Sequence, residues 1–191
     1  IVCCGIASAA ISPIQVGTAQ AVIDPPVGAF IAGHTLNRKF TGVHDHLYAK
    51  VVIVSHEQTS WGILTLDCIG LLYPQLLQIR EEVRQLRPTL SFPVDNLVLS
   101  STHTHAGPDV VGLWGPERMR SGVDSLYMQS LIRTCAEQII RAWEQRQPAV
   151  ARYATTEFGE DWVMNISQPA EVDRTLTTLQ FQDAGEIGRA H

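Results

Sequence analysis

Two histidines separated by one residue, His103 and His105, are the side chains of this 191-residue sequence best suited to chemistry. They follow an apolar run at 97–99 and precede a Gly-Pro break at 107–108. In an extended backbone, residues i and i+2 point to the same face, so both imidazoles could converge on one ligand. Neutral imidazole is a common zinc ligand, and a hydrolytic zinc site keeps an open position. The pattern therefore predicts a metal-assisted hydrolytic site.

A bare HxH pair also occurs in loops that bind no metal, but its place after a strand favours the metal site. A bound metal would activate water, and the second imidazole would hydrogen-bond the developing oxyanion. Metallo-β-lactamase-like hydrolases also place a T-H-x-H motif after an apolar strand, followed by x-D-H. Here Gly107 and Pro108 replace that Asp and His, which argues against this class.

Other polar residues could join the site. Asp67 ends the apolar run at 60–66, where it would either orient a ligating histidine or cap the next turn. His44 belongs to a second HxH pattern, which either lines the site or lies exposed in a loop. The long loop at 30–41, which holds Gly33 and His34, is of the kind that often carries function.

Hydrophobic periodicity predicts the elements that position these residues. We expect strands at 14–23, 47–54, 60–66, 96–100, 150–156 and 175–181, and helices at 73–86 and 125–145.

The order strand, helix, strand over 60–102 predicts a right-handed crossover that makes the two strands parallel. Ligands of such sheets gather outside the carboxyl ends of the strands, where Asp67, His103 and His105 would meet. The expected fold is therefore a single mixed α/β domain over residues 1–191. It has a largely buried β-sheet, flanking helices and a site at the carboxyl ends of strands.

Composition limits the function. Hydrophobic residues make up 45% and charged residues 17%, as in a globular domain. The net charge of −5, with no basic stripe, excludes nucleic acid as an expected partner. None of the four cysteines forms a CxxC pair, so we expect buried or free thiols.

The opening stretch, residues 1–13, is small and apolar. It is either the remnant of a secretion signal, which would favour a secreted or periplasmic protein over a cytoplasmic one, or a first strand or frayed terminus.

Five motifs follow one another along the chain. They are VGTA at 16–19, VIDPPVG at 22–28, GVHD with LYAK at 42–50, LTLD at 64–67 and NLVLSSTHTHAGP at 96–108. In this order they resemble the N-terminal region of the neutral/alkaline non-lysosomal ceramidase family, over about 16–183. The last motif, similar to NVxLxxTHTHSGPG, is the most specific.

The resemblance implies zinc-assisted hydrolysis of the N-acyl bond of ceramide, a step of sphingolipid metabolism that releases a fatty acid and a sphingoid base. It makes His103 a zinc ligand and His105 a catalytic residue near the scissile amide, and we assign substrate binding to His44 and Asp67. A lipid amide substrate also implies peripheral membrane contact. Asp109 stands where the ceramidases continue in glycine, which leaves the lipid specificity open.

The family takes its second zinc histidine from just beyond the segment that resembles 175–183, and Glu and Tyr ligands from later still. Residues 185–191 do not continue that pattern. We therefore expect an incomplete catalytic domain that binds Zn²⁺ weakly and is nearly inactive alone. The alternatives are a non-catalytic α/β module with a vacant metal site, and a hydrolase of another amide or ester.

Overall fold

The computed structural model describes residues 14–159 and 162–183. It divides into two compact units, one formed by residues 15–147 and the other containing the residues from 148 onward. The expected signal remnant (1–13) and the tail (185–191) lie outside the described residues.

Every strand and helix expected from the sequence is present, with ends shifted by at most a few residues. The chain runs through β1 (Ile14–Val22), β2 (Tyr48–His56), β3 (Thr59–Leu66), α1 (Tyr73–Leu86), the 3-10 turn η1 (Val94–Asn96), β4 (Leu97–Ser101), α2 (Ser125–Glu144), β5 (Gln147–Glu157) and β6 (Thr175–Asp183).

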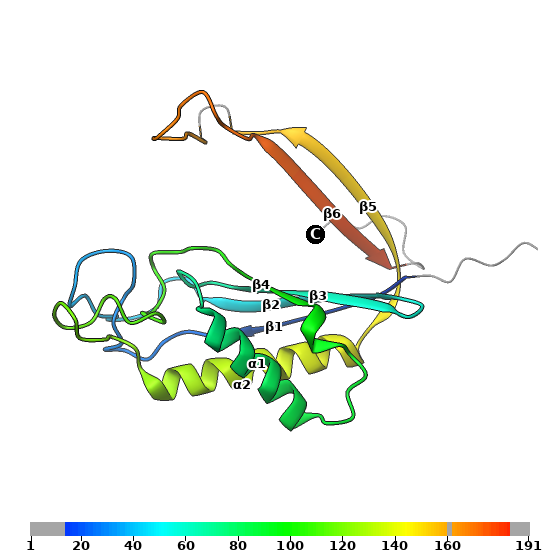
Figure 1. The fold of residues 1–191 in the computed structure, drawn as a ribbon, viewed down its shortest axis with the longest axis horizontal. Coiled ribbons are helices and arrows are strands. Elements are labelled where there is room, and N and C mark those ends of the chain that lie inside the picture. Colours follow the sequence, from blue (N-terminus) through cyan, green and yellow to red (C-terminus); the bar gives the residue numbers. More distant parts are fainter. Residues whose placement is uncertain (1–13, 160–161, 184–191) are drawn as a thin grey trace, which may run out of the picture. The chain divides into compact units, whose positions relative to one another are not determined.

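In the larger unit, four strands lie in the order β4-β3-β2-β1 (Figure 1). β2 pairs antiparallel with both β1 and β3, and β2 and β3 form a hairpin. β4 pairs parallel with β3 after the crossover through α1, as predicted. The parallel register sets Leu66 opposite Ser101, so both strands end at one edge of the sheet.

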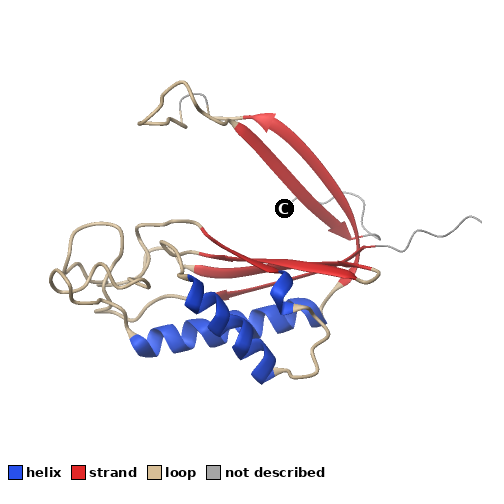
Figure 2. Ribbon diagram, in the orientation of Figure 1, coloured by secondary structure: helices blue, strands red, loops and turns tan. Residues whose placement is uncertain are grey.

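Both helices of this unit cover the same face of the sheet (Figure 2). Strand residues that alternate inward, such as Ile53 and Leu64, are fully buried with Ile79 of α1 and Ile139 of α2. The burial expected of the sheet is found on this helix-covered face, in β2 and β3 above all. On the other face Ile63 and Val98 are 38% and 59% exposed.

Local sequence explains where the helices begin. The carboxylate of Asp124 accepts hydrogen bonds from the amides of Leu126 and Tyr127, at 2.9 and 3.0 Å, and so caps α2. α1 has no side-chain cap but has a proline in its first turn, where the missing amide costs no hydrogen bond.

The smaller unit contains an antiparallel hairpin of β5 and β6, with Ala149 opposite Asp183 and Glu157 opposite Thr175. Most residues of both strands are exposed.

Cys68 and Cys135 are buried free thiols, as expected, and burial raises the pKa of Cys135 to about 12. No helix in the described part of the chain is long and apolar enough to cross a membrane.

Candidate functional site

The residues expected to do chemistry follow the ends of β3 and β4. The Thr102 amide donates to the carbonyl of Leu66 at 3.0 Å, and the Asp67 amide donates to the carbonyl of Tyr48 at 2.9 Å. Gly107 packs so tightly here that an added Cβ would lie 3.3 Å from Cys68 Cα. The segments after the two strands therefore lie against each other, as the parallel pairing requires.

His103 is held by a backbone carbonyl. Its Nδ1 lies 2.6 Å from the carbonyl oxygen of Ile69, and because a carbonyl can only accept, Nδ1 must carry the proton. In the neutral ring this leaves Nε2 with a free lone pair, as a metal ligand or hydrogen-bond acceptor requires. Sequence reasoning missed Ile69, because its contribution is a main-chain oxygen that every residue has.

Asp67 does not orient His103. One carboxylate oxygen, Oδ2, accepts the amide of Tyr48 at 2.9 Å and so ties the end of β3 to the start of β2. The carbonyl of Ile69, and not the carboxylate of Asp67, holds the His103 ring in place. Substrate binding by Asp67 stays a prediction.

His103 and His105 come together, but not through an extended backbone. His103 has a φ of +60°, in the left-handed region, two residues after β4 ends at Ser101. The ring centroids of the two histidines are 5.1 Å apart and nearly perpendicular. His34 also packs edge-on against His105, with ring centroids 5.5 Å apart. The structure thus brings three imidazoles together. The sequence predicted only that the third, His34, lies in a loop.

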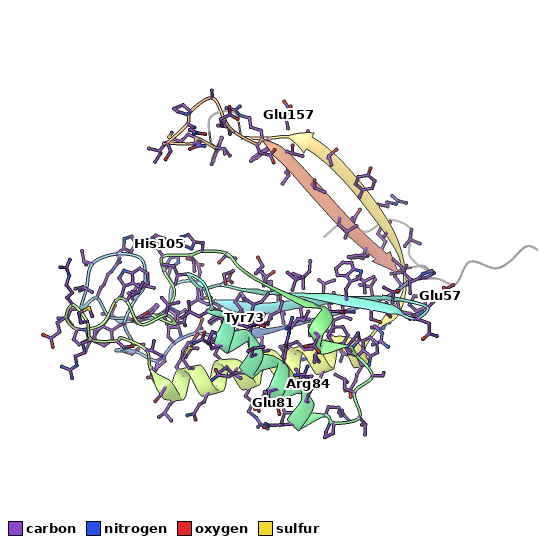
Figure 3. The ribbon with its side chains drawn as sticks, viewed as in Figure 1. Glu57, Tyr73, Glu81, Arg84, His105 and Glu157 are labelled. Atoms are coloured by element: carbon purple, nitrogen blue, oxygen red, sulfur yellow. The ribbon has the colours of Figure 1, made fainter. Side chains whose placement is uncertain are left out.

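Gly33 makes this gathering possible. Its φ is +88°, and an added Cβ would lie 2.6 Å from Nδ1 and 2.7 Å from Cβ of His105. A side chain at residue 33 would therefore occupy the space of His105. Figure 3 shows His105 at the loop-rich end of the sheet, opposite the end that carries Glu57.

A pocket of about 920 Å³ opens beside His105. Its walls come from the loop between β1 and β2 and from residues 104–106. His44 and His105 both line it, whereas His103 and Asp67 do not. The loop adds imidazoles, cations and apolar side chains, namely Ile31, His34, Arg38, Lys39, Phe40, Val43, His46 and Leu47.

Both pocket carboxylates are paired with histidines. Asp24 lies 2.6 Å from Nδ1 of His46 and also accepts the amide of Leu47 at 2.8 Å. Burial raises the pKa of Asp24, but the Leu47 amide and the His46 ring together lower it by more, so the net pKa is below its ordinary value. The second pair, Asp45 with His44 at 2.8 Å, is almost fully exposed.

Asp109 organises the neighbouring loop. Its side chain is 2% exposed and accepts the amides of five residues: Val111, Gly112, Leu113, Trp114 and Gly122. Its own amide donates to the carbonyl of Phe30 at 2.8 Å. The contacts of Asp109 are therefore those of a structural residue that supports the pocket loop.

Metal ligands are incomplete in the part of the chain that the structure describes. No group of three or more His, Cys, Asp or Glu side chains is placed to hold an ion there. His103, with Nδ1 bonded to a carbonyl, fits the requirements of one zinc ligand. A zinc site needs three or four protein ligands.

Fold and site together define a mixed α/β protein with a histidine-rich pocket beside the carboxyl ends of two parallel strands. No family model matches the sequence. The chain is 23% identical over 196 residues to neutral ceramidase A of Dictyostelium discoideum, an alignment covering 90% of this chain and 26% of that protein.

Two solved structures share the fold. Neutral ceramidase from Pseudomonas aeruginosa matches with a TM-score of 0.73 and 19% identity, over 90% of this chain and 30% of that one. A ceramidase complexed with C2 matches with a TM-score of 0.71 and 19% identity, over 90% and 29%. This chain thus spans between a quarter and a third of the length of these proteins. The matches support the resemblance carried by the motifs.

Proposed function

We propose that this chain carries part of a zinc-dependent amidohydrolase site, including His103 and His105, that cleaves the N-acyl bond of a ceramide-like lipid amide. The observation that carries the proposal is the hydrogen bond from Nδ1 of His103 to Ile69, because it leaves Nε2 available beside His105. The ceramidase names of the similar proteins supply the substrate class.

Each residue has a defined part in this proposal. His103 is one zinc ligand, and the other ligands would come from outside the described residues. When bound, zinc supplies Lewis acidity and lowers the pKa of water. His105 donates a hydrogen bond to the scissile carbonyl oxygen as negative charge develops on it.

Substrate binding falls to the pocket. His44 lies in its wall, where it would contact the polar part of the substrate, and the apolar loop side chains would hold the acyl chain. Asp67 would meet the substrate from the strand ends through the oxygen that the Tyr48 amide does not use. Contact with a membrane surface would supply a lipid substrate and belongs to the same proposal.

Zinc titration by calorimetry tests the metal site. His103→Ala should weaken binding by at least about tenfold, because it removes the oriented imidazole. His56→Ala is a matched control, since His56 ends β2 next to Glu57, which Figure 3 shows at the opposite end of the sheet from His105. Equal binding by wild type and His103→Ala would instead support the alternative, a non-catalytic α/β module. The missing third ligand among the described residues is what favours that alternative.

A further inference from the structure

Two adjacent cations, Arg38 and Lys39, line the pocket, and neither forms an ion pair among the residues that the structure describes. The ammonium of Lys39 lies 4.8 Å from the ring centroid of Phe30. This cation–π contact positions the ammonium without neutralising its charge.

The backbone that carries the two cations is fixed. The Ile31 amide donates to the carbonyl of Arg38 at 2.9 Å, and the Phe40 amide donates to the carbonyl of Ala29 at 2.9 Å. The Asn37 amide donates to the carbonyl of Gly115 at 2.8 Å, which ties this loop to a second one. The backbone at Arg38 and Lys39 is therefore held in place in the pocket wall.

Neither of the two carboxylates that line the pocket pairs with Arg38 or Lys39. Asp24 is bonded to His46 and to the Leu47 amide, and Asp45 is bonded to His44. Arg38 and Lys39 therefore have no carboxylate partner among the pocket residues and are free to pair with an anionic ligand. A ligand with an anionic group would complement their charge.

The same pocket has an apolar side, formed by Ile31, Phe40, Val43 and Leu47. Its volume of about 920 Å³ is large enough for a ligand with both a hydrocarbon chain and a polar head.

We propose that the pocket selects an N-acylated amine whose amine part carries a carboxylate, an N-acyl amino acid, and that Arg38 and Lys39 bind this carboxylate. This inference rests on the proposed amide hydrolysis and changes its substrate class, because ceramide carries no charge. Water would add to the acyl carbon and the C–N bond would break, with the nitrogen taking up a proton. The products would be a fatty acid and an amino acid.

The proposal is tested by measuring the affinity of three probes with the same acyl chain by calorimetry. Each probe is kept below its critical micelle concentration. N-lauroylglycine is an anionic amide, N-lauroylethanolamine is a neutral amide, and laurate is a carboxylate without an amide. We expect N-lauroylglycine to bind about tenfold more tightly than either of the others, because its carboxylate would pair with the cations of the pocket wall. Added salt should reduce this preference.

The double variant Arg38→Gln/Lys39→Gln should abolish the preference while its thermal unfolding stays close to that of wild type, since both side chains are exposed. Arg118→Gln/Arg120→Gln is the matched control, because it removes the same charge from a loop outside the pocket lining.

Three results would overturn the inference. Equal affinity for the two amides would refute it and leave the amide site standing. Laurate binding as tightly as N-lauroylglycine would show that the cations hold the fatty-acid carboxylate instead. A preference that survives in Arg38→Gln/Lys39→Gln would place the carboxylate elsewhere. The zinc titration of His103→Ala decides the proposed function separately.

Discussion

Replacing Gly33 by alanine should displace His105. The new Cβ would lie 2.7 Å from the Cβ of His105, and ordinary contact begins at 3.4 Å, so the two atoms must separate by 0.7 Å (3.4 − 2.7). Rotating the imidazole cannot provide this, because the Cβ of His105 is fixed to its backbone. We expect about 1 kcal/mol from the left-handed backbone and about 1–3 kcal/mol from the overlap.

Gly28→Ala is the matched control, because Gly28 has nearly the same φ, +93°, with nothing within 4 Å of its added Cβ. It should show the backbone cost alone. Each kcal/mol lowers the Tm of a domain this size by about 2–4 °C, so calorimetry separates the two variants. The NMR signals of the His105 ring should shift in Gly33→Ala and stay in place in Gly28→Ala. If both variants lose the same stability and leave those signals unchanged, the close approach of Gly33 to His105 is wrong.

Two further predictions concern the carboxylates beside the pocket. Asp109→Asn should lower the free energy of unfolding, measured in urea, by about 3 kcal/mol, because the new amide group would face backbone N–H groups that now donate to a buried carboxylate. Asp95→Asn, at an exposed carboxylate, should lower it by under about 1 kcal/mol. Equal losses of stability in the two variants would contradict the structural role of Asp109. Because the pKa of Asp24 is lowered in the folded state, the unfolded chain binds more protons between the two pKa values, and stability rises with pH there. The contribution of Asp24 is therefore complete above about pH 4 and is lost as pH falls through the folded-state pKa. Asp24→Asn should flatten the acid limb of Tm against pH, and an unchanged limb would refute the lowered pKa that the Leu47 amide and His46 give Asp24.

The sequence predicted the strands and helices because hydrophobic periodicity is a local signal, and it predicted the parallel pairing of β3 with β4 from the order of the elements. The apolar run before Asp67, the helical spacing at 73–86 and the apolar run before His103 were enough to predict parallel strands with a shared edge. The division into two compact units was not predicted, since chain length and composition do not show where packing is interrupted.

Within the site, the sequence identified the side chains but not the contacts that orient them. The proximity of His103 to His105 was expected from an extended backbone, whereas the structure achieves it through a left-handed residue. The hydrogen bond from His103 to Ile69 is accepted by a main-chain oxygen, so no residue type in the sequence could have predicted it. The approach of His34 to His105 and the pairing of Asp24 with His46 join residues brought together only by loop conformation.

The most direct test of the account is the tautomer of His103, read from ¹⁵N NMR of the imidazole at pH 8, where an ordinary histidine is neutral. Ile69 should hold the proton on Nδ1 and leave Nε2 unprotonated, and added zinc should shift the Nε2 resonance of His103 while that of His56 stays in place. A proton found on Nε2, or an Nε2 resonance that zinc does not move, would contradict the proposed metal site.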